Sequence, residues 1–356
     1  MRIAHVTMAR VRGGVIRVLE TLARHREPGD EFLVISGPGT RPSISIGGVL
    51  WEERAVRGNL APLVLGGLYR TLGRFEPDAL VIHACAPGEL AILAALASRR
   101  WPTVVLEHLP EYQPLGTPTR NRLYAWLDRK ASCWLAVSRA GARALEARWG
   151  LASGTIGHLH MGVEEPSPYL PDEEIMFLEE KSGRALILGL GSPEERKGFP
   201  LFCELAERMW KTSARFVWVG GPRRERRGYV EVWPWTSHVG GWLHRADMLL
   251  VPSLAEGLPL VVLEAMACGV PVIASPVGGI PEAITEGFEG LLLPTDDVDR
   301  WVGAVASLSA DPVRRETMGK AARERWVREF TATAMVRRIT ALLREAMAAH
   351  RKRGRG

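Results

Sequence analysis

The amino-acid sequence predicts an α/β protein of two domains, each built from a parallel sheet wrapped by helices. Short apolar segments typical of buried strands alternate with amphipathic segments typical of helices along most of the chain. The length of 356 residues favours two domains over one. A stretch rich in Glu and Pro, residues 162–181, interrupts this alternation and is predicted to be the interdomain linker.

The elements follow in order along the chain. Strands are predicted at residues 2–8, 32–36, 79–83, 103–107 and 134–138, with helices at 15–23, 89–98 and 140–149. A second series opens with a strand at 185–190 and a helix at 199–209, and a last helix is predicted at 332–348. The expected domains are therefore 1–165 and 166–330, followed by a C-terminal helix at 331–349 and a basic tail at 350–356.

The most informative stretch of the chain is EGLPLVVLEAMACGVPVIAS, residues 256–275. Pro259 has a preset φ and lacks an N–H group, which suits the first turn of a helix. We expect a helix from near Leu258 to Ala267, ended by Gly269. A buried strand at residues 270–274 should follow.

This helix and its two glutamates suit a nucleotide sugar. A helix N-terminus presents unpaired N–H groups and partial positive charge, which favour phosphate. Glu256 lies just before the N-terminus, and Glu264 about 7–8 Å further along the helix. One carboxylate then suits the hydroxyls of a sugar and the other those of a ribose, with the diphosphate between them. Two unrelated glutamates on a surface helix are the alternative.

Two cations follow the first strand of the second series. Gly191 begins a turn that carries Arg196 and Lys197 before the next helix. Cations in such a loop face the carboxyl ends of parallel strands, where α/β proteins bind ligands. This pair is therefore a candidate for binding an anionic ligand, and an exposed Arg-Lys turn is the alternative.

The first domain offers weaker signals. Arg12, Gly13 and Gly14 lie between the first strand and the first helix, where glycine allows close approach of a phosphate or sugar. Tight-turn geometry explains the glycines equally well. His108 and His83 each end a strand and are candidates for function, although strand-end histidines are more often structural.

Several segments together resemble one known family. The stretch 256–275, the upstream ADMLLVPS at 246–253, and the downstream VGGIPE at 277–282 and GLLLP at 290–294 are similar to family-4 (group 1) retaining glycosyltransferases. The resemblance implies the GT-B fold, in which two Rossmann-like domains face each other across a cleft. It also implies that the first domain receives the acceptor, that the second receives the donor, and that the C-terminal helix at 331–349 crosses back to the first domain. In the resembled family, Arg196 and Lys197 would neutralise the leaving diphosphate, and a histidine at the place of His108 faces the sugar, which makes His108 preferred over His83.

The resemblance also assigns roles to the candidate residues. It implies metal-independent transfer of a hexose-type sugar from a nucleotide-diphosphate sugar to an acceptor hydroxyl, with retention of configuration. The acceptor is expected to be a glycan, a lipid-linked sugar or a small molecule. The implied catalytic residues are Glu256, Lys197, Arg196 and His108. The implied donor-binding residues are Glu264, Gly257, Leu258, Pro259, Leu260 and Gly191, and the glycine turn of the first domain is the implied acceptor or phosphate loop.

The sequence departs from the family at three places. Only Gly-Trp-Leu-His-Arg separates Gly240 from Ala246, where the family has a longer stretch with a short helix near the nucleotide base. His160-Met161 replaces the usual asparagine before glycine. Leu190 or Gly191 occupies the usual arginine position. The shortened stretch supports the alternative of a non-catalytic GT-B protein that binds a sugar nucleotide or assists a transferase. A sugar-nucleotide epimerase is a further alternative, because that chemistry also occurs on the GT-B fold.

Composition narrows the location and the partners. The formal net charge is +6, and residues 1–165 carry 20 Lys and Arg against 15 Asp and Glu, which suits an anionic acceptor. No apolar run is long enough for a membrane span or a signal peptide, so we expect a cytoplasmic protein with possible peripheral contact to the inner face of an anionic membrane.

Other features that suggest chemistry have simpler explanations. Asp297 and Asp299 have a metal-like spacing, but capping of the helix that follows explains them, and the four Cys show no metal-ligand spacing. The arginine-rich segment 223–227 lacks interleaved aromatic residues, so no nucleic-acid partner is expected. Three tryptophans either line a pocket or pack at the core or its rim, namely Trp233, Trp235 and Trp242.

Overall fold

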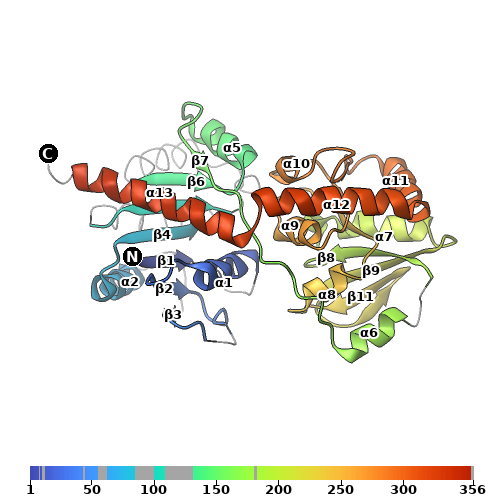
Figure 1. The fold of residues 1–356 in the computed structure, drawn as a ribbon, viewed down its shortest axis with the longest axis horizontal. Helices are drawn as coiled ribbons and strands as arrows, with labels where there is room; N and C mark the ends of the chain where they lie inside the picture. Colours follow the sequence, from blue (N-terminus) through green and yellow to red (C-terminus); the bar gives the residue numbers. More distant parts are fainter. Residues whose placement is uncertain are drawn as a thin grey trace. The chain divides into compact units, whose positions relative to one another are not determined.

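The computed structural model describes residues 1–7, 9, 13–42, 45–54, 62–84, 100–108, 131–179 and 183–353. The chain forms two compact units (Figure 1). The first comprises Met1–Met161 together with Ala332–Gly356, and the second comprises Gly162–Thr331.

The first unit contains a seven-stranded sheet in the order β3-β2-β1-β4-β5-β6-β7, with every neighbouring pair parallel. Its strands are β1 (Arg2–Thr7), β2 (Glu31–Ser36), β3 (Val49–Glu53), β4 (Ala79–Ala84), β5 (Thr103–Glu107), β6 (Cys133–Ala136) and β7 (Gly157–His158). Continuous apolar runs such as that of β4 form these strands because both faces of the sheet are covered. The predicted strands are therefore present.

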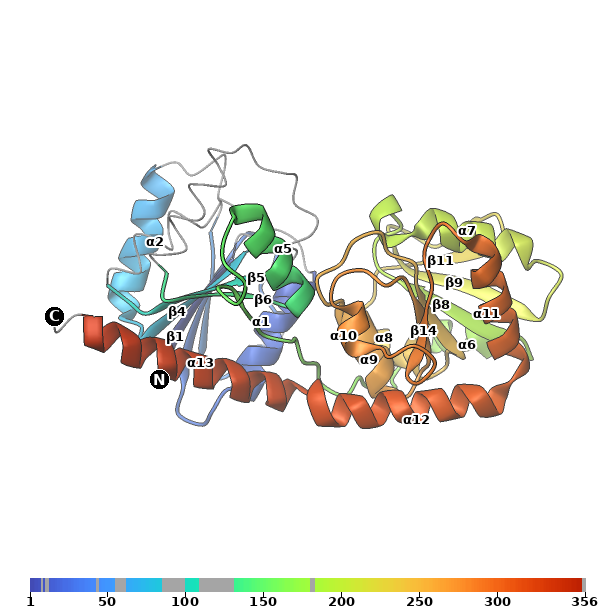
Figure 2. The same cartoon turned by 90° about the horizontal axis from the view of Figure 1, so that it is seen from above.

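Helices cover both faces of this sheet. Figure 2 shows α2 (Pro62–Phe75) and α5 (Arg139–Trp149) on one face, and α1 (Gly14–His25) and α13 (Ala332–Arg353) on the other. Helix α1 buries Ile16, Leu19 and Leu22, which recur at helical spacing. Helix α13 packs against α1 and β5. The helix predicted at residues 89–98 lies outside the described residues.

The second unit repeats this topology with the order β10-β11-β9-β8-β12-β13-β14, in which only the β10–β11 pair is antiparallel. Its strands are β8 (Ala185–Leu190), β9 (Ala214–Gly221), β10 (Glu225–Arg227), β11 (Val230–Pro234), β12 (Met248–Val251), β13 (Val272–Ala274) and β14 (Gly290–Leu292). The fold class expected from the sequence, α/β with two largely parallel sheets, is confirmed.

Helices also flank the second sheet. Helices α7 (Phe199–Arg208) and α11 (Val298–Ala310) contribute to one apolar core with the strands. Helix α9 (Leu260–Ala267) packs against β12 and β13, and α12 (Pro312–Glu329) packs against α9. Shorter helices are α6 (Asp172–Glu179), α8 (Val239–Leu243) and α10 (Ile280–Ala283).

Two expectations about irregular segments are corrected. The predicted linker, residues 162–181, contains α6, which folds because Phe177 is buried against the ring of Trp233, 4.6 Å between centroids. The shortened segment before Ala246 still contains a short helix, α8. This helix approaches the chain at Pro166 and Tyr169 closely, because Gly240 and Gly241 lack a Cβ there.

The topology marks one place in each sheet for ligand binding. The chain moves outward in one direction from β1 and in the other from β4, and it does the same from β8 and β12. At such a switch point the loops that follow adjacent strands separate and leave a crevice at the carboxyl ends. Among the described residues, those that follow β8 and β12 are therefore placed for function.

No helix in the described part of the chain combines the length and apolarity that a membrane span requires.

Helices α9 and α12 meet through two glycines. A Cβ atom at Gly319, which lies within α12, would overlap the carbonyl oxygen of Gly269 at the end of α9. Because that obstacle is backbone, a rotamer change cannot relieve the overlap. The position of α9 therefore depends on the absence of a side chain at Gly319.

We expect Gly319→Ala to lower the free energy of unfolding of the second unit by about 1–3 kcal/mol through overpacking. Gly303 is the matched control, because it also lies within a helix, α11, and a Cβ there would meet nothing within 4 Å. Gly303→Ala should instead raise stability by about 0.5–1 kcal/mol. Urea titrations of both variants measure the difference, and equal effects would contradict the packing argument.

Candidate functional site

The loop after β8 and the turn after β12 meet at the switch point of the second sheet. The backbone N–H of Leu254 donates to the carbonyl of Arg196 at 2.8 Å, and Arg196 Nη1 donates to the carbonyl of Ala255 at 3.3 Å. Gly198 adopts a left-handed φ of 74°, and a Cβ there would overlap the carbonyl of Pro252. Glycine is required at this position because the two backbones touch.

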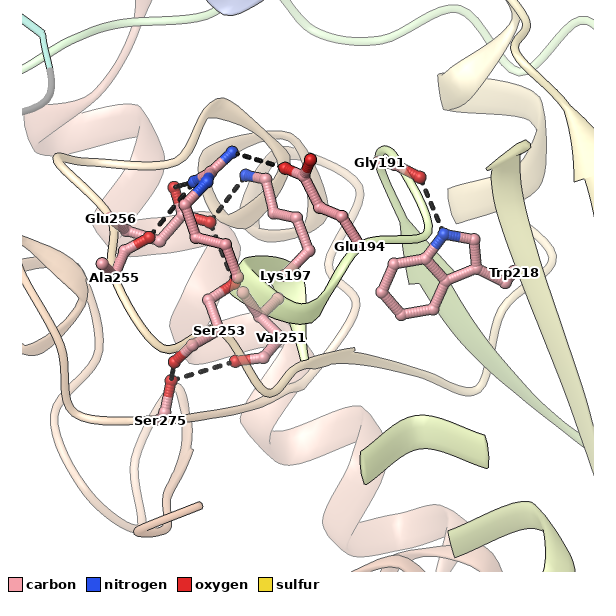
Figure 3. Close-up of polar contacts among 10 residues, drawn as sticks. Gly191, Glu194, Lys197, Trp218, Val251, Ser253, Ala255, Glu256 and Ser275 are labelled. Carbon is pink, nitrogen blue, oxygen red and sulfur yellow. Dashed lines mark hydrogen bonds and ion pairs between the residues drawn. The ribbon is translucent and has the colours of Figure 1, made fainter. Parts of the chain in front are cut away.

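An ion pair between the buried carboxylate of Glu256 and the partly buried Lys197 lies at this junction. Lys197 Nζ is 2.6 Å from Glu256 Oε1, which also accepts a hydrogen bond from Ser253 Oγ at 2.9 Å (Figure 3). Arg196 Nη1 lies 3.9 Å from Glu256 Oε2, and Arg196 Nη2 is 2.9 Å from Glu194 Oε1. Glu256 is only 4% exposed. The structure therefore brings together three predicted site residues, and an arriving anion would compete with Glu256 for both cations.

Residues around this pair that the sequence did not single out hold its backbone. Trp218 Nε1 donates to the carbonyl of Gly191 at 2.7 Å, which fixes the start of the β8 loop. Ser275 Oγ donates to the carbonyl of Ser253. A buried Trp and two strand-end Ser give no sequence signal for these contacts, because the contacts depend on which strands are neighbours.

A turn at Gly278 and Gly279 contacts the backbone at the start of the predicted donor-binding stretch. The N–H of Gly279 donates to the carbonyl of Gly257 at 2.5 Å. Gly278 has a φ of 57°, and a Cβ there would overlap the carbonyl of Glu256. This segment follows β13, so the segments after three neighbouring strands, β8, β12 and β13, form one compact site.

Helix α9 begins later than predicted. Pro259 is the N-cap residue, with φ −71° and ψ 126°, and the first helical residue is Leu260. Proline disfavours helical backbone at the residue that precedes it, and this excludes Leu258 from the helix. Pro259 supplies no side-chain cap, the first turn carries no acidic residue, and the N–H of Val262 donates to the carbonyl of Pro259 at 3.1 Å. The partial positive charge at this end of the helix favours an anion.

Glu264 lies on α9 and is 2% exposed, so the alternative of two glutamates on a surface helix is excluded. The charge of Glu264 affects the pKa of Cys268, which lies one helical turn further along. Burial raises the pKa of the Cys268 thiol to about 12, and the Glu264 carboxylate contributes to this rise. Cys268 is therefore a neutral thiol and offers no nucleophile near the site.

In the first unit, Gly13 is the N-cap residue of α1 and Gly14 its first residue. Gly13 has φ −126° and ψ −166°, an extended conformation open to any residue, and a Cβ there would meet nothing within 4 Å. Tight-turn geometry therefore does not explain this glycine. Arg12 lies outside the described residues.

The two candidate histidines belong to one buried chain of three rings. His5 in β1, His83 in β4 and His108 after β5 are hydrogen-bonded in series, with 3.0 Å from His5 Nδ1 to His83 Nε2 and 3.1 Å from His83 Nδ1 to His108 Nε2. His108 is 9% exposed and the other two are buried. The sequence missed His5, because a histidine within a strand gains meaning only when the neighbouring strand is known.

Burial keeps these imidazoles neutral. It lowers the pKa of His5 from 6.5 to about 3 and that of His108 to about 4. Burial also lowers the pKa of His83 well below its ordinary value, and the other two rings add to this shift. Desolvation disfavours the charged form of each ring.

A cavity of about 370 Å³ lies at the carboxyl end of β11. All three tryptophans that the sequence left open line it, together with Glu174 and Arg224. Trp233 and Trp242 are buried and Trp235 is 56% exposed. Burial raises the pKa of Glu174. The tryptophans therefore serve both as core and as wall of this cavity.

The remaining charged motifs have structural partners. Asp297 Oδ1 accepts a hydrogen bond from the N–H of Arg300 at 3.2 Å, so the predicted capping role is confirmed. Glu225 pairs with Arg223 and Arg227 on the short strand β10. Within the described residues, no three His, Cys, Asp or Glu side chains are placed to hold a metal ion.

Two family models match the chain in tandem. Residues 11–165 match glycosyltransferase family 4, and residues 184–311 match glycosyl transferases group 1. The chain therefore belongs to the group 1, family 4 glycosyltransferases, as the sequence motifs indicated.

Curated relatives agree with this family. The sulfoquinovosyl transferase of Arabidopsis thaliana is 30% identical over 332 residues, which cover 84% of this chain and 64% of the relative. A D-inositol 3-phosphate glycosyltransferase of Kribbella flavida is 51% identical over 83 residues, which cover 23% of this chain and 20% of the relative. The matches thus span less than two thirds of the length of these relatives.

Solved structures share the fold over the whole chain. A glycosyltransferase from Rickettsia africae has a TM-score of 0.81 at 17% identity, covering 97% of this chain and 98% of that chain. The Anabaena protein HepE in complex with UDP-glucose has a TM-score of 0.76 at 18% identity, covering 97% and 100%. The expected pair of Rossmann-like α/β units, as in GT-B glycosyltransferases, is confirmed.

The histidine chain makes stability depend on pH. The unfolded chain protonates these rings below about pH 6.5, whereas the folded rings resist protonation down to about pH 4. Unfolding then takes up protons, so the free energy of unfolding should fall as the pH is lowered between these values. His5→Asn removes one titrating ring but keeps an N–H donor, and it should reduce this slope. Thermal midpoints measured from pH 4 to 8 test this, and an unchanged slope in the variant would refute it.

Proposed function

We propose that this protein is a retaining, metal-independent glycosyltransferase that moves a hexose-type sugar from a nucleotide-diphosphate sugar to an acceptor hydroxyl. The observation that carries this proposal is the pair of the partly buried Lys197 with the buried Glu256, close to a start of α9 that has no side-chain cap. Two cations, a carboxylate and a helix N-terminus at one switch point match the charges and hydroxyls of a sugar nucleotide.

The donor would bind to the second unit. Glu264 would hold the ribose hydroxyls, Glu256 the sugar ring, and the first amides of α9 the diphosphate. Arg196 and Lys197 would stabilise the charge that develops on the leaving diphosphate, which is electrostatic stabilisation of the transition state. Both cations already lie together at the β8 loop, and the diphosphate would replace Glu256 as the partner of Lys197.

The acceptor would bind to the first unit, where His108 and the turn at Gly13 and Gly14 end near the switch point of that sheet. The acceptor oxygen would form a bond to the anomeric carbon while the bond from that carbon to the diphosphate breaks. The acceptor proton would pass to a donor phosphate oxygen. Arg196, Lys197 and the start of α9 would stabilise the diphosphate in place of a metal ion.

The relatives suggest which ligands to try first. HepE has been crystallised with UDP and with UDP-glucose, which makes a UDP-sugar the first donor to test. The excess of basic over acidic residues in 1–165 supports an anionic acceptor, glycan or lipid-linked, with peripheral contact to an anionic membrane in the second case.

Thermal stabilisation by UDP, GDP, ADP and their sugar conjugates tests the donor site. A ligand that binds only the folded state raises stability by about 2.7 kcal/mol at 100 times its Kd. We expect one nucleotide to raise the midpoint and Glu264→Ala to abolish the rise. Glu316→Ala, which removes an exposed glutamate on α12, should keep it. No rise with any nucleotide would contradict the proposed function.

Turnover separates a transferase from its alternatives. Lys197→Ala should lower kcat by about 10²–10³ because it removes a cation from the transition state. Donor consumption that requires an acceptor supports transfer. Interconversion of the donor without an acceptor would identify an epimerase instead, and nucleotide binding without turnover would identify a non-catalytic binding protein.

A further inference from the structure

The buried histidine chain has a property that a single histidine lacks. Each of its two hydrogen bonds joins one ring nitrogen to another, His5 Nδ1 to His83 Nε2 and His83 Nδ1 to His108 Nε2. A neutral imidazole has one N–H and one lone pair. The proton position on one ring therefore fixes the proton positions on the other two.

Only two arrangements satisfy both hydrogen bonds with neutral rings. In the first, every ring carries its proton on Nδ1, His5 donates to His83, and His83 donates to His108. In the second, every proton is on Nε2 and both bonds run in the opposite direction. His108 Nδ1 is then an N–H donor in the first arrangement and an acceptor in the second.

The buried end of the chain distinguishes the two arrangements. His5 Nε2 is buried and has no hydrogen-bond partner among the described residues. The ring of Phe32 packs beside it, 4.8 Å between centroids. The second arrangement would bury an unpaired N–H donor at this point, whereas the first buries only a lone pair. Orphaned buried N–H groups are rarer than unsatisfied acceptors, because a buried donor without a partner is costly.

We propose that His5 and His83 are positioning residues that lock His108 as a neutral hydrogen-bond donor through Nδ1. The inference rests on the proposed function in one respect, namely that the oxygen accepting this bond belongs to a sugar substrate. Burial supports the neutral state, since it lowers the pKa of all three rings.

The location supports the role. His5 and His83 lie on β1 and β4, the two strands that flank the switch point of the first sheet, and His108 follows β5 at the same edge. A neutral N–H donor suits a hydroxyl oxygen, because it orients the oxygen without adding charge or removing its proton. His108 acting as a general base would need the opposite arrangement.

Nitrogen NMR of the full chain, labelled with ¹⁵N-histidine, tests the proposal directly. The two neutral tautomers differ in the shifts of their ring nitrogens and in the couplings from those nitrogens to carbon-bound protons. Resonances of His5, His83 and His108 are assigned by their loss in single variants. We expect all three rings to carry the proton on Nδ1 at pH 7. A proton on Nε2 of His108, or a charged ring, would overturn the proposal.

Two variants of His5 test the positioning role. His5→Leu removes the donor to His83, so His83 and His108 should become mixtures of tautomers, while His5→Asn retains an amide N–H near the Nδ1 position. With a nucleotide sugar and acceptor, kcat should fall about tenfold in His5→Leu, the loss of one oriented hydrogen bond, with KM for the donor unchanged. His5→Asn should restore both the tautomer and most of kcat.

The two readouts separate the possible failures. Locked tautomers in a wild-type chain without transferase activity would refute the proposed function, and the assignment of the oxygen to a sugar substrate with it, because the NMR measurement needs no substrate. Equal loss of kcat in His5→Leu and His5→Asn, with both variants folded, would overturn the positioning role.

Discussion

The ion pair between Lys197 and Glu256 is the interaction on which the rest of the site depends. The carboxylate is almost fully buried, so its charge is tolerated only because Lys197 and Ser253 satisfy it. Removing Lys197 would leave the buried carboxylate without its closest opposite charge, which is unfavourable. The pair thereby holds the β8 loop against the β12 turn and presents both cations at one point.

Backbone contact makes this pair possible. Gly198 and Gly278 lie where a Cβ atom would overlap a carbonyl oxygen, of Pro252 and of Glu256 respectively. Both have left-handed φ values, which glycine adopts without strain. The two glycines allow close backbone contact between the segments that follow β8, β12 and β13. The hydrogen bonds from the N–H groups of Leu254 and Gly279 then fix the positions of these segments. The ion pair of the site therefore depends on this specific backbone geometry.

The two sheets place different chemistry at equivalent positions. At the switch point of the second sheet, burial is compensated by opposite charges, which suits a diphosphate. At that of the first sheet, burial is accommodated by neutral imidazoles that satisfy one another, which suits an uncharged hydroxyl. One topology thus carries a charged site in one unit and a neutral polar site in the other.

The sequence predicted those features that depend on local pattern. The strands with long apolar runs, the capping role of Asp297 and the grouping of Arg196, Lys197 and Glu256 follow from periodicity, turn chemistry and motif order. Strands β3, β7, β9, β10 and β11 were not predicted. Helix α9 starts at Leu260, two residues after the predicted start near Leu258. Proline disfavours helical backbone at the residue before it, so Leu258 is not part of the helix.

Features that depend on the order of strands were not predicted. His5 joins His83 because β1 and β4 are neighbours, although 78 residues separate the two rings in the chain. Trp218 and Ser275 reach the site in the same way, across strands that no single segment identifies. Helix α6 formed within the expected linker because Trp233, which is distant in the sequence, buries Phe177.

A crystal structure of the full chain with a nucleoside diphosphate tests the central claim most directly. The account predicts that the diphosphate lies at the start of α9, that Lys197 Nζ has moved from Glu256 Oε1 to a phosphate oxygen, and that Glu264 contacts the ribose. A diphosphate bound elsewhere, with the 2.6 Å contact between Lys197 and Glu256 intact, would contradict it.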